Sequence, residues 1–173
     1  VLVVICVAVL FFGCKQDEDS ISTGSSSSDD TQELTGTWNF VDGDGADGIN
    51  KDVNQNANYP TAIGFNSKLY AAWEEFDGTR KQIRVAEWDG ASTWSFVDGD
   101  AATGINKDAI QDAYAPRLVE FNSKLYVTWA ESNGSAGQIR VAEWDGASTW
   151  SFVDGDGSTG INKDTSNSTG RPK

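Results

Sequence analysis

The chain has 173 residues, and its 13 Lys and Arg residues against 26 Asp and Glu residues give it a net charge of −13. So acidic a surface repels phosphate backbones, which excludes nucleic acid as a partner. Histidine is absent, which removes Ser-His-Asp and Cys-His catalytic sites and histidine-ligated zinc.

The chain opens with an unbroken apolar run, Val1–Phe12, followed by Gly13 and Cys14. The run is too short to span a bilayer, which takes about 20 residues, but it has the length of the apolar region of a secretion signal. Gly13-Cys14 resembles a bacterial lipobox, which implies a truncated signal peptide over 1–13 and a lipid on Cys14 that anchors the protein to a membrane. The alternative is a buried strand that ends in a structural cysteine.

Residues 14–34 are acidic and rich in serine, with few large apolar side chains, so we expect a disordered tether. Its start, Lys15–Glu18, resembles the surface-export signal of some Gram-negative lipoproteins. The expected location is therefore the bacterial outer membrane or cell surface.

The rest of the chain is a repeat. Trp38, Trp94 and Trp150 share one context, and their spacing is constant (94 − 38 = 56 and 150 − 94 = 56). The run Gln82–Asp100 recurs unchanged as Gln138–Asp156. A fixed period of this size predicts stacked supersecondary units.

Within one repeat, short runs of β-branched and aromatic residues alternate with Gly, Asn, Asp and Ser, which predicts strands joined by turns. The second copy gives strands at 117–121, 124–131, 138–144 and 149–153, with a two-residue turn at Asn122-Ser123. No stretch has helical periodicity. We therefore predict an all-β fold of four-stranded antiparallel sheets with bulky side chains on both faces.

The patterns KLYxxW, QIRVAxWDG and TWxFVDG resemble bacterial β-propeller repeats of the sialidase and kelch-like kind, and Asp89–Trp94 and Asp145–Trp150 are similar to Asp-box turns. The resemblance implies a partial β-propeller over 35–173. Propellers have about 4–8 blades, so we expect either a fragment of a longer chain or short chains that associate into a ring. The expected parts are an orphan fourth strand at 37–42, blades at 60–98 and 116–154, and the start of another copy at 172–173.

In such a blade, the link between successive blades lies at the same edge as the turn between the second and third strands. Differences between the copies fall mainly at this edge, which predicts a binding face. The alternative is that unconstrained loops drift. The candidate ligand-binding residues are Tyr59, Phe76, Asp77, Arg80, Tyr114 and Asn133.

The acidic link Asp42–Asp52 resembles a calcium loop, but it lacks the EF-hand spacing and closing glutamate. Turn formation by Asp, Asn and Gly explains it better, so we expect no metal or cofactor, with calcium as the alternative.

Catalysis would have to use carboxylates. Glu75/Glu131 and Glu87/Glu143 recur in both copies, which is typical of structural residues, so no catalytic residue is named. Glu74 is not repeated, and the sequence names no partner for it. Arg84 and Arg140 are expected to pair with carboxylates between blades.

Together these features predict a lipid-anchored surface protein that binds a glycan or a protein without catalysis. A sialidase-like or other glycoside hydrolase, with catalytic blades outside this sequence, is the alternative. A purely structural spacer or adhesin is a third possibility.

Overall fold

A computed structural model describes residues 39–42, 48–99, 103–155, 157, 159–164 and 166. The expected signal peptide, Cys14 and the tether lie outside these residues. Both sheets belong to one compact unit, Trp38–Lys173.

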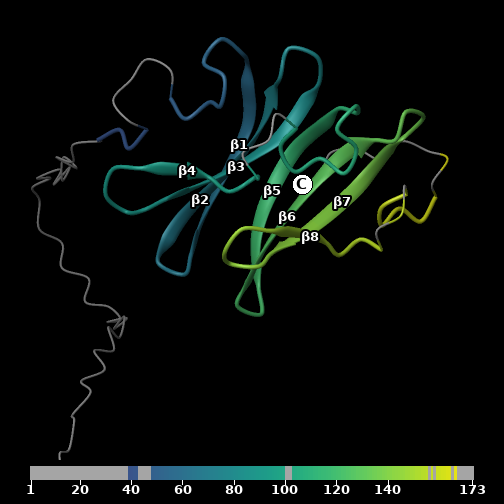
Figure 1. The fold of residues 1–173 in the computed structure, drawn as a ribbon. Coiled ribbons are helices and arrows are strands. Elements are labelled where there is room, and N and C mark those ends of the chain that lie inside the picture. Colours follow the sequence, from purple (N-terminus) through teal and green to yellow (C-terminus); the bar gives the residue numbers. More distant parts are fainter. Residues whose placement is uncertain are drawn as a thin grey trace, which may run out of the picture. The chain divides into compact units, whose positions relative to one another are not determined.

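The described residues form two four-stranded antiparallel sheets and no helix, which confirms the predicted all-β architecture (Figure 1). Each sheet has its strands in sequence order, as expected for a meander. Sheet 1 contains β1 (Ala57–Phe65), β2 (Lys68–Phe76), β3 (Lys81–Trp88) and β4 (Trp94–Phe96). Sheet 2 contains β5 (Ala113–Phe121), β6 (Lys124–Ser132), β7 (Gly137–Trp144) and β8 (Trp150–Phe152).

Two backbone features shape each sheet. The hairpin turn Asn122-Ser123 has positive φ at both residues, as does its counterpart in sheet 1, which confirms the predicted two-residue turn. The first strands β1 and β5 begin earlier than expected, because each continues through a bulge at the residue before its proline. Tyr59 and Ala115 occupy these bulges with φ of 53° and 51°.

The expected strand at 37–42 is not a strand over its described residues, 39–42. A strand requires a hydrogen-bonded neighbour, and no described strand pairs with this segment. The segment nevertheless contacts sheet 1, since Trp94 Nε1 donates to the Val41 carbonyl at 2.6 Å. Trp150 Nε1 donates in the same way to Val97, which is the repeat counterpart of Val41, at 2.9 Å.

The two sheets pack face to face, and the contact joins opposite faces of the repeat. We name the two faces of each sheet. Face A carries Phe65, Tyr70, Ala72, Ile83 and Val85 in sheet 1 and the residues 56 positions later in sheet 2. Face B is the opposite face. Face A of sheet 1 packs against face B of sheet 2, where the buried apolar residues are Leu125, Val127, Trp129, Ala142 and Trp144. Trp129 and Trp144 of sheet 2 therefore belong to the core between the sheets, and the half-buried Trp150 packs against it.

The link after β4 returns to β3 and forms hydrogen bonds with its main chain. Ile105 N donates to the Ile83 carbonyl at 3.0 Å. Asn106 then acts in place of a strand, because its Oδ1 accepts from Ile83 N at 2.9 Å and its Nδ2 donates to the Lys81 carbonyl at 3.1 Å. Asn162 makes the equivalent contacts with β7.

The expectation that Arg84 and Arg140 pair with carboxylates between blades is wrong. Arg84 Nη1 lies 3.3 Å from Asp98 Oδ2, and Arg140 Nη1 lies 3.4 Å from Asp154 Oδ2, so each pair is formed within one repeat. The physical reason is the short fourth strand, which brings the aspartate that follows it back over the third strand.

Candidate functional site

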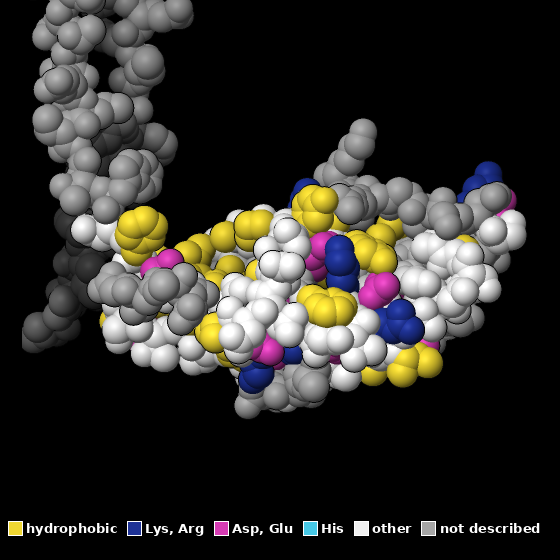
Figure 2. Space-filling view, turned by 90° about the horizontal axis from the view of Figure 1, so that it is seen from above, with side chains coloured by type: hydrophobic (Ala, Val, Ile, Leu, Met, Phe, Trp, Pro, Cys, Tyr) yellow, Lys and Arg dark blue, Asp and Glu magenta, His cyan; other side chains and the backbone are white. Residues whose placement is uncertain are grey.

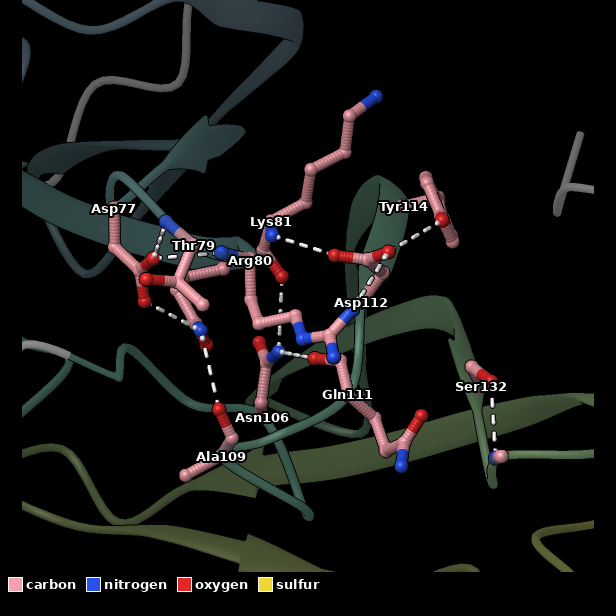
Figure 3. A network of polar contacts seen from close by, with 12 residues as sticks. Asp77, Thr79, Arg80, Lys81, Asn106, Ala109, Gln111, Asp112, Tyr114 and Ser132 are labelled. Atoms are coloured by element: carbon pink, nitrogen blue, oxygen red, sulfur yellow. Dashed lines mark hydrogen bonds and ion pairs between the residues drawn. The ribbon is translucent and has the colours of Figure 1, made fainter.

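The turn between β2 and β3 meets the link between the sheets at one edge of the molecule, as the sequence predicted. Figure 3 shows this network of polar contacts. Lys81 N donates to Asp112 Oδ1 at 2.9 Å, and Gln82 Nε2 donates to the Ala109 carbonyl at 3.4 Å. These contacts fix the loops that differ most between the two repeats.

A cavity of about 290 Å³ opens beside these loops, lined by Asn56, Asn58, Glu74, Phe76 and Lys81. All five lining residues differ from the residues 56 positions later, which are Asp112, Tyr114, Ala130, Ser132 and Gly137. A second cavity, of about 230 Å³, includes Asp98, Gly104 and Trp150 in its lining, and these residues recur in the repeat. The first cavity is therefore the one that departs from the shared scaffold.

Glu74 is the most constrained residue of this cavity. Its side chain is only 1% exposed, and its Oε2 accepts a hydrogen bond from Ala115 N, in the bulge of β5, at 3.0 Å. Its Oε1 lies 2.9 Å from Lys81 Nζ. The carboxylate is thus held between the two sheets with one cationic partner that reaches solvent.

Lys81 connects the cavity to the link and to sheet 2. Its Nζ lies 5.0 Å from the centre of the Tyr114 ring, which is close enough for a cation–π contact. Tyr114 donates its hydroxyl hydrogen to Asp112 Oδ2 at 3.2 Å. Arg80 Nη1 lies 3.9 Å from the same oxygen, and the Arg80 side chain is 46% exposed. The predicted residues Phe76, Arg80 and Tyr114 are therefore gathered around Lys81.

Two other residues predicted to bind a ligand, Asp77 and Asn133, instead stabilise the turn between the second and third strands of each sheet. Asp77 Oδ1 accepts from Thr79 N and Arg80 N at 2.8 and 2.7 Å, and its Oδ2 accepts from Gln82 Nε2. Burial acts to raise the pKa of Asp77, but the hydrogen bonds from Arg80, Thr79 and Gln82 outweigh it and lower the pKa below 3.8. Asn133 closes the equivalent turn of sheet 2 through Ser135 N and Ala136 N.

Tyr59, the remaining predicted residue, is partly exposed and sits in the bulge of β1. The sequence prediction did not include Asn56, Asn58 or Lys81, and it left Glu74 without a partner. Comparing the two repeats position by position would identify these four residues, because each of them is replaced by a different residue type in the other repeat.

Glu75 and Glu131, one of the two repeated glutamate pairs, each hold the link against the second strand of a sheet. Glu131 Oε2 accepts from Trp129 Nε1 at 2.8 Å, and its two oxygens accept from Lys107 N and Asp108 N. Burial raises the pKa of Glu131 and these hydrogen bonds only partly offset the rise. Glu75 makes the equivalent contacts in sheet 1.

Within the described part of the chain, no group of three or more Cys, Asp or Glu side chains converges as a metal site. Asp44 and Asp47 of the acidic link lie outside the described residues. Nor do the described residues include a helix long and apolar enough to cross a membrane.

Figure 2 looks from above onto the edge that carries the variable loops. Basic, acidic and hydrophobic side chains are interleaved on this surface, without one dominant charge. The surface around the cavity thus offers both polar and apolar contacts.

No protein-family model matches the chain, and no curated protein matches it.

Proposed function

We propose that this chain is a lipid-anchored bacterial surface protein whose sheets are blades of a sialidase- or kelch-like β-propeller, and that its cavity binds a glycan without transforming it. The observation that carries the binding proposal is the cavity's lining, in which every residue departs from the repeat.

The chemistry of the cavity suits a sugar. A sugar ring presents an apolar face and hydroxyl groups that donate and accept hydrogen bonds. Phe76 supplies an aromatic ring, Asn56 and Asn58 supply amide donors and acceptors, and the Glu74–Lys81 pair supplies one carboxylate and one ammonium. A cavity of about 290 Å³ lies at the small end of ligand pockets, which favours one or two sugar units.

The carboxylate count favours binding over hydrolysis. Glycoside hydrolysis uses two carboxyl groups that flank one bond. The described lining contains one, Glu74, and both of its oxygens are already engaged by Ala115 N and Lys81 Nζ.

The propeller and the anchor rest on separate arguments. The propeller is supported by four-stranded antiparallel sheets that pack opposite faces together. The anchor is supported by the sequence around Cys14, and palmitate labelling tests it. A Cys14→Ala protein that still incorporates label or fractionates with membranes would refute the anchor.

An oligosaccharide array, followed by calorimetry on the bound sugars, tests the binding site. The variants Phe76→Ser and Glu74→Ala introduce the residues that sheet 2 carries at the same positions, Ser132 and Ala130. We expect each to weaken binding at least tenfold, while the control Ser132→Phe in sheet 2 leaves binding unchanged. Binding that survives both cavity variants would refute the site, and cleavage of a bound sugar would refute the non-catalytic role.

A further inference from the structure

The polar groups that line the cavity differ in what they leave open to a ligand. The ammonium group of Lys81 carries three N–H donors. Among the described residues one acceptor meets these donors, Glu74 Oε1 at 2.9 Å. The Lys81 side chain is 36% exposed, so its other donors remain available at the cavity.

The surroundings of the Lys81 ammonium fix its position before any ligand binds. The backbone N–H of Lys81 donates to Asp112, and Figure 3 shows the side chain extending away from that carboxylate. Glu74 holds Nζ from β2, and the Tyr114 ring lies 5.0 Å from Nζ. A cation that is already placed loses little conformational freedom on binding.

The carboxylates near Lys81 are used within the protein. Glu74 is 1% exposed, and its two oxygens accept from Lys81 Nζ and Ala115 N. Asp112 accepts from Lys81 N and from the Tyr114 hydroxyl, and it is not a lining residue. The lining thus presents an ammonium group to a ligand, but no accessible carboxylate.

Asn56 and Asn58 complete the polar lining. Both residues are exposed, and neither side chain forms a hydrogen bond with a described residue. An amide can donate or accept, whereas an ammonium group can only donate. The groups that a ligand can reach therefore favour an acceptor, and one of them carries a positive charge.

The net charge of −13 repels an anion at long range. At physiological salt, however, exposed charges more than about 8 Å apart are largely screened from one another. A hydrogen bond from an ammonium group to an anion is about twice as strong as one between neutral groups. The contact with Lys81 therefore outweighs the charge of the distant surface.

The Glu74–Lys81 pair is specific to the first repeat. The residues 56 positions later are Ala130 and Gly137, so sheet 2 lacks both members. Sheet 2 nevertheless forms the same four-stranded antiparallel arrangement. The fold of a sheet thus does not depend on the pair, which leaves the pair free to serve the cavity.

We propose that the ligand of this cavity is an acidic sugar, and that Lys81 Nζ donates to its carboxylate or sulfate group. This inference rests on the proposed glycan binding and narrows it to one class of sugar. Asn56 and Asn58 then bond the hydroxyl groups of the same sugar, while Phe76 contacts its apolar face.

An array of neutral, carboxylated and sulfated glycans tests the inference on the full chain. We expect every bound glycan to carry an anionic group, and the array shows which of the two groups it is. Calorimetry then compares a bound sugar with its neutral form, the methyl ester of a carboxylate or the desulfated form of a sulfate. The charged form should bind about tenfold more tightly, and added sodium chloride should reduce this preference.

The variant Lys81→Gln removes the charge and should abolish the preference for the charged form. If this variant does not fold, which thermal melting reports, the double variant Lys81→Gln with Glu74→Gln leaves no buried carboxylate without a cation. Lys124→Gln is the matched control, because Lys124 also pairs with a glutamate, Glu143 at 2.6 Å, but lies outside the cavity lining. The control should keep the preference.

Glycans that bind and are all neutral would overturn this inference while the proposed binding function stands. A charged form that binds no better than its neutral form would overturn it too, as would a preference that survives the loss of the Lys81 charge. An array without any bound glycan would refute the binding function itself, and this inference with it.

Discussion

The substitution Gly104→Ala tests how the link is held against sheet 1. Gly104 has φ of +56°, and a Cβ atom there would lie 2.2 Å from the Ile83 carbonyl oxygen. The backbone oxygen of a central strand cannot move aside, so the link must lift from β3. Gly48 is the same position one repeat earlier, with φ of +62° and nothing within 4 Å of a Cβ atom. Both substitutions therefore introduce backbone strain, but only Gly104→Ala also introduces a steric clash with the Ile83 carbonyl.

The expected loss of stability follows from these contacts. Placing alanine in the left-handed region costs about 1 kcal/mol in both variants. Lifting the link also breaks the bonds from Ile105 N to Ile83 O and from Ile83 N to Asn106 Oδ1, each worth about 1 kcal/mol. Gly104→Ala should thus lower the free energy of unfolding by about 3 kcal/mol, and Gly48→Ala by about 1 kcal/mol.

Urea unfolding followed by tryptophan fluorescence measures both losses on the same chain. Equal losses in the two variants would refute the reasoning, because they would show that the link does not need close contact with Ile83. Unequal losses with Gly48→Ala the larger would refute it as well.

Three further outcomes follow from the contacts. Asn106→Ala removes both side-chain bonds to β3 and should lower the free energy of unfolding by about 2 kcal/mol in urea titrations. Burial, with Glu87 nearby, raises the pKa of Tyr70 from 10.0 to about 12, so stability should fall as pH rises between these values, and Tyr70→Phe should flatten that slope. Hydrogen bonds from the backbone of Ala91, Thr93 and Ser92 lower the pKa of Asp89 below 3.8. The free energy of unfolding should therefore fall as the pH drops below 3.8, and this fall should be smaller in Asp89→Asn.

The sequence was sufficient to predict the sheets, because the repeat makes every pattern appear twice. Asn122-Ser123 falls between two alternating apolar runs, and only a two-residue turn fits that spacing. The start of β5 was not predictable in the same way. Proline at 116 argues against a strand, and the positive φ at Ala115 that lets the strand continue has no sequence signal, since alanine rarely adopts it.

The cavity was only partly predictable. Phe76 and Tyr114 were selected because they border loops that differ between the repeats, and Phe76 lines the cavity while Tyr114 contacts Lys81. The same reasoning selected Asp77 and Asn133, which close turns. A short polar side chain in a turn and one in a binding site look alike in sequence. Glu74 has one partner in its own sheet, Lys81, and a second in Ala115 N, which the bulge of β5 brings to it across the contact between the sheets.

The central claim about the fold is that face A of the repeat is covered in sheet 1 and, over the described residues, more exposed in sheet 2. Hydroxyl-radical labelling at a dilution where the chain is monomeric measures the accessibility of Phe65 and Phe121 in the same sample. The account predicts heavy oxidation of Phe121 and protection of Phe65. Equal labelling of the two phenylalanines would contradict it.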